Sequence, residues 1–172
     1  MNIMFSKPEH REKIISLAKI TPAVKDFIFT WESWHNWEKY PPVVAVNKAG
    51  TVTGFWAYTY SNKRKYINTY YHTVYLIYRR QGISSLMLEF ILQNCDAERM
   101  KLKTHFNGEG EKFWRGLGFQ PFAKNDKQEL VWDFDIRNCK SIAGIIDWNR
   151  NPDLHQPIPE AEMKKYKELE LL

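Results

Sequence analysis

The sequence predicts a mixed α/β layer fold, in which helices pack on a central sheet. The hydrophobic pattern alternates between two types along the chain. Some segments are rich in β-branched and aromatic residues, as strands are, and others place apolar residues three or four positions apart, as helices do. The chain has 172 residues, 44% of them hydrophobic and 15% aromatic, which is enough for one domain to bury a core without disulfides or metal.

The N-terminal part is expected to be helical. Residues 14–29 have helix-like apolar spacing, which Pro22 interrupts. Trp31, Trp34 and Trp37 follow at three-residue spacing and would lie on one face of a helix. Core packing is the default explanation for such a face, and a substrate-facing aromatic wall is the alternative.

Three strands should follow. Residues 43–46 and 51–60 flank a turn that contains Gly50, which predicts a β-hairpin. After a polar turn, residues 66–75 are again rich in β-branched and aromatic side chains and form the third expected strand.

The second half of this region alternates between helix and strand. Apolar residues recur at helical spacing from Ile83 to Ile91, which predicts an amphipathic helix after Gly82. Residues 100–106 return to a strand pattern. Residues 107–117 fit a helix that ends at a glycine.

A last pair of strands is expected at residues 119–123 and 128–135. Beyond them the composition changes, with three prolines and a charged helix candidate at residues 160–172. We therefore expect a domain at residues 1–135 and a C-terminal extension at residues 136–172. The extension either packs on the domain or binds a partner.

Composition excludes several classes of protein. Cys95 and Cys139 form no C-x-x-C motif, which favours a reduced, cytoplasmic setting. No stretch approaches the roughly 18 apolar residues of a membrane span, and the N-terminal residues do not resemble a signal peptide. The histidines show no metal-ligand spacing. We expect a monomer or homodimer with no metal and no membrane contact.

Positive charge is concentrated in the middle of the chain. Residues 61–105 carry 8 basic and 3 acidic residues, an excess equal to the formal charge of the whole chain, +5. Such a segment attracts phosphate, whether in a cofactor or in nucleic acid, although most charged segments are simply solvated.

A phosphate site is predicted inside this basic segment, where the third strand meets the amphipathic helix. The first turn of a helix leaves backbone N–H groups without partners, and together with the helix dipole they attract anions. Gly82 permits close approach to the backbone, and Arg79 and Arg80 add positive charge. The hydroxyl groups of Ser84 and Ser85 can donate hydrogen bonds. The alternative is an ordinary strand-to-helix turn.

Residues 79–84, Arg-Arg-Gln-Gly-Ile-Ser, resemble the acyl-CoA pyrophosphate loop of the GNAT N-acetyltransferase superfamily. That pattern is Gln or Arg, two residues, Gly, one residue, then Gly or Ala, and Ser84 stands at the last position here. Val74 lies five residues before Arg79, where the superfamily commonly has a valine.

A second motif supports the resemblance. Superfamily members often carry an asparagine after the fifth strand, then a helix that ends in Phe-Tyr, then Gly-Phe. This chain has Asn107, then Phe113-Trp114, then Gly118-Phe119 in the same order and at the same spacing. The resemblance covers roughly residues 40–135.

The resemblance implies a GNAT-like mixed, mostly antiparallel central sheet flanked by helices, and acetyl-CoA as the acyl donor. A bulge would separate the third strand from its neighbour and let its backbone pair with the pantetheine arm. Asn107 would contact the cofactor near its thiol, with a simple N-cap as the alternative. The cofactor-binding residues implied are His72, Thr73, Val74, Arg79, Arg80, Gln81, Gly82, Ile83, Ser84, Ser85 and Asn107.

Acyl transfer to an amine needs a neutral amine, a polarised thioester and a proton for the departing thiolate. The superfamily often uses a tyrosine as the acid, but Trp114 stands at that position, and indole is not an acid near neutral pH. Regular strand alternation would place residues 68, 70, 72 and 74 on one face. We therefore expect His72 and Tyr70 as catalytic candidates, with His105 in reserve.

Three functions follow as hypotheses. The first is an acyl-CoA-dependent N-acyltransferase that moves acetyl to a primary amine of an unidentified acceptor. The second is a protein that binds or modifies nucleic acid, indicated by basic residues 63–65 and many tyrosines and tryptophans. The third is a non-catalytic interaction protein with a GNAT-like fold, suggested by Trp114.

Overall fold

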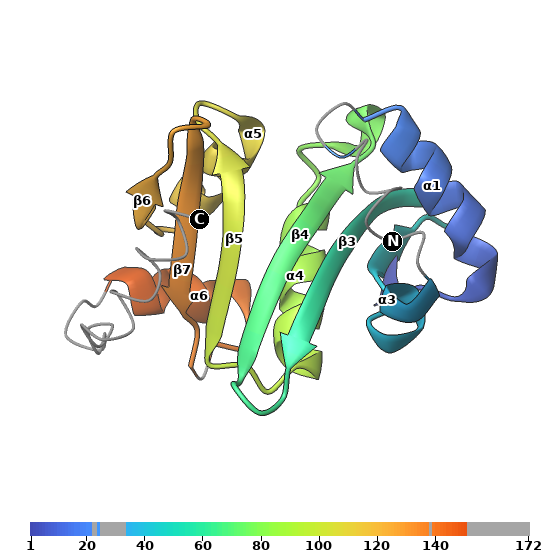
Figure 1. The fold of residues 1–172 in the computed structure, drawn as a ribbon. Helices are drawn as coiled ribbons and strands as arrows, with labels where there is room; N and C mark the ends of the chain where they lie inside the picture. Colours follow the sequence, from blue (N-terminus) through green and yellow to red (C-terminus); the bar gives the residue numbers. More distant parts are fainter. Residues whose placement is uncertain (22–23, 25–33, 138, 151–172) are drawn as a thin grey trace.

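The computed structural model describes residues 1–21, 24, 34–137 and 139–150 (Figure 1). Their strands form one seven-stranded sheet in the order β1-β2-β3-β4-β5-β7-β6. Neighbouring strands are antiparallel except for β4 and β5, which are parallel. The expected mixed, mostly antiparallel sheet is thus confirmed. The strands are β1 (Asn2–Phe5), β2 (Val43–Val46), β3 (Val52–Ser61), β4 (Tyr66–Val74), β5 (Arg99–His105), β6 (Ala123–Lys124) and β7 (Glu129–Asp135).

Helices cover both faces of the sheet. The larger core cluster lies between one face and the helices α4, α5 and α6, and it contains Met87, Ile91 and Trp114. A smaller cluster lies under α1 on the other face and contains Ile14 and Leu17. None of the described helices is long and apolar enough to cross a membrane. The helices are α1 (Arg11–Lys19), α3 (Trp34–Lys39), α4 (Ile83–Asn94), α5 (Glu109–Gly116) and α6 (Ile142–Arg150), with 3₁₀ turns η1 (Pro8–His10) and η3 (Leu76–Tyr78).

Most expected elements are confirmed, with differences at the ends. The last helix of the predicted domain begins at Glu109, two residues later than expected. A strand was expected at residues 119–123, but only Ala123–Lys124 pairs with β7, because Phe119 turns into the core and stacks on Phe134. The N-terminal strand β1 was not anticipated.

Some expectations fall wholly or partly outside the described residues. Helix α1 ends at Lys19, and the rest of the expected helix up to residue 29 is not described. Of the three tryptophans at three-residue spacing, only the side chain of Trp37 is described, and it is buried in the smaller cluster, as core packing predicts. The helix candidate at residues 160–172 is not described either.

The chain after β7 contributes to the larger core cluster as far as α6. Ile136, Cys139 and Ile145 are buried there, and Ile145 belongs to α6. Asn149 donates a hydrogen bond of 2.8 Å from its side chain to the carbonyl of Leu117. These residues therefore share the core of the sheet, while a domain boundary at residue 135 stays a prediction.

A β-bulge in β4 shapes the centre of the sheet. Ala57 of β3 pairs with Tyr71 and the next residue, Tyr58, pairs with Thr69, so Tyr70 is the extra residue. Just before this bulge β4 stops pairing with β5, and the last pair is Asn68 with Lys101. Beyond that point the two strands diverge, which leaves a V-shaped opening in the sheet (Figure 1).

Candidate active site

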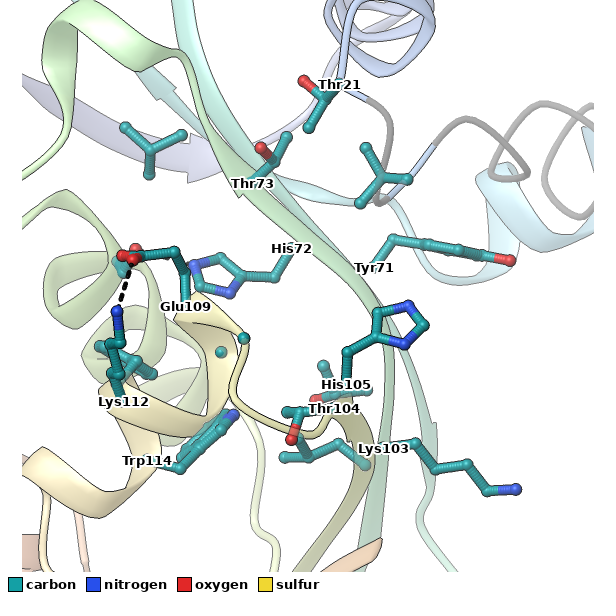
Figure 2. A pocket seen from close by; sticks show the side chains of 18 of the residues that line it. Thr21, Tyr71, His72, Thr73, Lys103, Thr104, His105, Glu109, Lys112 and Trp114 are labelled. Carbon is teal, nitrogen blue, oxygen red and sulfur yellow. Dashed lines mark hydrogen bonds and ion pairs between the residues drawn. The ribbon is translucent and has the colours of Figure 1, made fainter. Parts of the chain in front are cut away.

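The opening between β4 and β5 is a cleft of about 920 Å³ (Figure 2). Its walls are the second half of each strand, the turn before α4 and the first turns of α5. Most of the predicted cofactor residues lie on these walls, whereas Gln81 and Asn107 do not. Those lining the cleft are His72, Thr73, Val74, Arg79, Arg80, Gly82, Ile83, Ser84 and Ser85.

The turn before α4 has the open backbone that an anion site needs. Gly82 is the N-cap of α4, with a left-handed φ of 74°, and no side chain caps the helix. The first backbone N–H groups of the helix, those of Ile83, Ser84 and Ser85, find no acceptor in the described part of the chain. A Cβ on Gly82 would meet nothing within 4 Å. The predicted phosphate cradle, residues 80–85, therefore has N–H donors without an acceptor among the described residues, and space in front of them.

Basic side chains flank this cradle, and one acid accompanies them. Arg79 donates from Nε to the carbonyl of Val74 at 3.0 Å, while Arg80 lies 3.2 Å from the carboxylate of Glu109. Lys112 lies 3.2 Å from the same carboxylate (Figure 2). The hydrogen bond from Lys112, reinforced by the charge of Arg80, lowers the pKa of Glu109.

Glu109 and Lys112 were not predicted as site residues. Their only sequence signal is an acid and a base three residues apart at the start of a helix, which is common on helix surfaces. Their place beside the cradle depends on how α5 packs against β5.

The structure corrects the prediction that residues 68, 70, 72 and 74 share a face. His72 lies opposite Trp56 and Thr69 lies opposite Tyr58, and both partners belong to the larger core cluster. The bulge at Tyr70 has shifted the alternation by one residue. His72 consequently faces the side of the sheet that carries α4 and α5, away from the face of Asn68.

His72 is held tightly on that side. Its ring stacks on Trp56 with centroids 4.2 Å apart, and its Nε2 shares a hydrogen bond of 2.8 Å with Oγ of Ser84. Burial, with a smaller contribution from the charge of Arg79, lowers the pKa of His72 to about 4. The imidazole is therefore neutral at pH 7 and connects β4 to the first turn of α4.

The other catalytic candidates occupy different positions. Tyr70, the bulged residue, is 45% exposed and lines the cleft. His105 also lines the cleft and is exposed at the end of β5. In Figure 2 its ring lies on the opposite side of the β4 ribbon from the ring of His72. The structure thus places His72 and His105 on opposite sides of β4.

Asn107 is not an N-cap, which was the alternative to the expected cofactor contact. The N-cap of α5 is Gly108, and Asn107 precedes it with a left-handed φ of 59°. The backbone N–H of Asn107 donates to the carboxylate of Glu111 at 2.6 Å, and Glu111 also pairs with Arg115. Asparagine suits this place because it tolerates the left-handed conformation better than most residues.

Trp114 is mainly a core residue. It is 2% exposed and packs against Trp56, Phe119 and Phe134, although it reaches the wall of the cleft. Within the described residues, no group of three or more His, Cys, Asp or Glu side chains could hold a metal ion.

No protein-family model and no curated protein matches the sequence. Solved structures do match the fold. An acetyltransferase of the GNAT family from Staphylococcus aureus Mu50 has a TM-score of 0.66 at 16% identity, covering 79% of this chain and 99% of that one. An aminoglycoside 6′-N-acetyltransferase complexed with coenzyme A has a TM-score of 0.64 at 11% identity, covering 79% and 97%.

A third match extends the range of acceptors among these structures. The ribosomal-protein-S18-alanine N-acetyltransferase from Escherichia coli has a TM-score of 0.61 at 12% identity, covering 79% of this chain and 94% of that one. The matches span 94–99% of each acetyltransferase and 79% of this chain. This protein therefore has the fold of the GNAT acetyltransferases.

Proposed function

We propose that this protein is an acyl-CoA-dependent N-acyltransferase that transfers acetyl from acetyl-CoA to a primary amine. The observation that carries the proposal is the open cradle at Gly82, placed at the end of β4, which beyond Asn68 pairs with no other described strand on the β5 side. Free N–H donors, an empty space and two arginines suit a pyrophosphate. The GNAT fold and the coenzyme A in one matching structure support the same donor.

The residues of the cleft fit the parts of acyl-CoA in order. The cradle would hold the pyrophosphate. From there the β4 edge at His72, Thr73 and Val74, which pairs with no other described strand on the β5 side, offers backbone groups to the pantetheine arm. The arm would run along β4 toward the bulge, so the thioester would lie in the opening between the strands.

The reaction itself places few demands on the protein. The amine nitrogen forms a bond to the acyl carbon, the carbon–sulfur bond breaks, the amine loses a proton and the thiolate gains one. Holding the two reactants together supplies much of the rate in such a step. Proton transfer by His72, Tyr70 or His105 stays a prediction. A neutral His72 bonded to Ser84 suits positioning on the cofactor side better than proton transfer near pH 7.

Two measurements test the proposal. Calorimetric titration with acetyl-CoA and with S-acetylpantetheine, which lacks the nucleotide and its phosphates, measures whether the phosphate end contributes to binding. Release of free thiol is then followed with a panel of amines. Binding of acetyl-CoA together with amine-dependent thiol release supports the proposal, whereas absence of both would refute it.

A further inference from the structure

The ring of His72 lies between two aromatic rings on the side of the sheet that carries α4 and α5. It stacks on Trp56, with centroids 4.2 Å apart and ring planes 24° apart, and the ring of Phe113 from α5 lies 5.6 Å away. The imidazole is half-buried and lines the cleft. Among the described residues, its one hydrogen bond joins Nε2 to Oγ of Ser84 at 2.8 Å. The surrounding rings therefore hold Nε2 against a single hydroxyl group.

Ser84 brings that hydroxyl group into the phosphate cradle. It is the second residue of α4, two positions after Gly82, and its own backbone N–H finds no acceptor in the described part of the chain. It stands where the resembled loop pattern has Gly or Ala, so this chain adds a polar side chain at this point. Ser84 also lines the cleft. The hydroxyl group bonded to His72 thus belongs to the same site as the N–H donors of the cradle.

The direction of this hydrogen bond decides what Ser84 can offer to a phosphate. A serine hydroxyl has one proton, and a neutral imidazole carries its proton on either Nδ1 or Nε2. If Ser84 donates to a bare Nε2, its oxygen has only lone pairs left for a ligand. If Nε2–H donates to Oγ instead, the hydroxyl proton is free for another acceptor. The low pKa of His72 keeps the ring neutral at pH 7, so both arrangements are accessible to the free protein.

A bound pyrophosphate discriminates between the two arrangements, because its ionised oxygens accept hydrogen bonds and donate none. On the basis of the proposed acyl transfer, we infer that His72 is a positioning residue: its Nε2–H donates to Oγ of Ser84 and directs the Ser84 hydroxyl proton to a phosphate oxygen of acyl-CoA. The hydrogen bonds in such a chain strengthen one another, and the aromatic rings fix the imidazole before the cofactor binds.

The tautomer of His72 gives the direct test. Two-bond 15N–1H correlation spectra of protein with labelled histidine distinguish Nε2–H from Nδ1–H. The spectrum of His72→Gln assigns the His72 signals among the five histidines of the chain. We expect Nε2 to carry the proton in the complex with acetyl-CoA. A complex in which only Nδ1 carries it would overturn the inference.

A double-mutant cycle measures whether His72 acts through Ser84. Acetyl-CoA is titrated by calorimetry into wild type, His72→Phe, Ser84→Ala and the double variant. His72→Phe keeps an aromatic ring beside Trp56 but cannot donate, and it should raise Kd about three- to tenfold, the usual effect of one hydrogen bond. In the Ser84→Ala background the same change should alter Kd by less than about twofold. His72→Gln, whose amide can donate to Oγ, should recover most of the loss.

His10 provides the matched control. It is also a histidine with little exposed surface, and its Nδ1 accepts a hydrogen bond of 3.1 Å from the backbone N–H of Lys7, but it lies outside the cleft. His10→Phe should change the thermal stability and leave the Kd for acetyl-CoA as in wild type. Thermal unfolding shows which variants are folded. Should His72→Phe fail to fold, the tautomer in wild-type protein decides the inference.

The outcomes separate this inference from the proposed function. If acetyl-CoA binds and is turned over but His72→Phe raises Kd equally with and without the Ser84 hydroxyl group, His72 acts by packing alone, and the inference is wrong while acyl transfer stands. If Ser84→Ala binds acetyl-CoA as tightly as wild type, the hydroxyl group contributes nothing to binding and the inference is also wrong. If wild-type protein does not bind acetyl-CoA, the proposed function fails and the inference fails with it.

Discussion

Gly82 combines a backbone conformation that favours glycine with open space in front of its Cα. Its φ of 74° is a conformation that L side chains rarely adopt, and the space in front of its Cα is open. Gly50, in the turn between β2 and β3, has the same two properties, with a φ of 77° and nothing within 4 Å. The two positions differ in that Gly82 lines the cleft and Gly50 does not.

This pair gives a matched test of the phosphate cradle. Gly82→Glu should abolish acetyl-CoA binding, because the carboxylate would occupy the cradle and repel phosphate. Gly50→Glu should lose a similar amount of stability, about 1–2 kcal/mol for the left-handed backbone, and keep its affinity. Calorimetric titration and thermal denaturation of both variants measure the two effects. Equal affinity in the two variants would mean that the phosphate binds elsewhere.

His72 provides a prediction about stability against pH. Its pKa is about 4 in the folded protein, below the value near 6.5 of an unfolded chain. Between these values the unfolded state binds a proton that the folded state does not, so the free energy of unfolding falls as pH drops from 6.5 to 4. Above pH 6.5 this contribution is fully present.

We expect this single group to remove up to about 3 kcal/mol of stability across that range. The measurement is denaturant unfolding of wild type and His72→Gln from pH 4 to pH 7.5. The stability difference between them should narrow toward low pH. His10, whose pKa is also lowered by burial, is present in both proteins and cancels. Parallel curves would show that His72 titrates normally.

At the scale of elements, the helix α4 and its preceding turn could be predicted because their signals are local. The apolar spacing from Ile83 to Ile91 and the glycine before it belong to one short segment. The bulge at Tyr70 could not be predicted in the same way, because an extra residue in a strand leaves the composition of β4 unchanged. Because the bulge shifts the alternation of side chains, the prediction that His72 shares a face with Asn68 is wrong.

Short elements were missed or misjudged for a related reason. The strand β1 has four residues, too few for a pattern to distinguish it from a loop, and its pairing with β2 depends on a distant segment. The expected strand at residues 119–123 has the composition of a strand, but Phe119 packs against the rings of Trp114 and Phe134 in the core. Tertiary packing decided both cases.

Asn107, which lies just before α5, has two roles that can be separated by experiment: a left-handed backbone conformation and a predicted side-chain contact with the cofactor. Its left-handed φ of 59° predicts that Asn107→Ala loses about 1 kcal/mol of stability, while Asn107→Gly keeps that conformation and loses less. If the side chain also contacts the cofactor, as the resemblance implies, both variants should raise the KM for acetyl-CoA equally. Thermal unfolding and steady-state kinetics on the two variants measure this. A normal KM in Asn107→Gly would restrict Asn107 to a backbone role.

At the scale of the whole molecule, the cleft depends on one irregular place in an otherwise continuous sheet. The antiparallel pairs on either side extend along the strands, while β4 and β5 pair at only three positions before they diverge. The two halves are joined beneath the opening by the larger core cluster, to which α4 and α6 both contribute. The width of the cleft should therefore depend on how firmly that core is packed.

Ile145 tests whether the chain after β7 belongs to this cooperative unit. It is 1% exposed in α6 and packs in the larger core cluster. Ile145→Ala should lower the free energy of unfolding by about 2–5 kcal/mol, the usual cost of such a truncation in a core. Ile20→Ala, at a position that is 63% exposed, should change the free energy of unfolding by less than about 0.5 kcal/mol.

Denaturant unfolding followed by circular dichroism and by tryptophan fluorescence should give one coincident transition, shifted as a whole in Ile145→Ala. Residues 136–150 would instead be a separable extension if Ile145→Ala left the main transition in place and produced an earlier, smaller one. The same variant should then also leave acetyl-CoA affinity untouched, whereas a shared core predicts that binding weakens as the two halves of the sheet loosen.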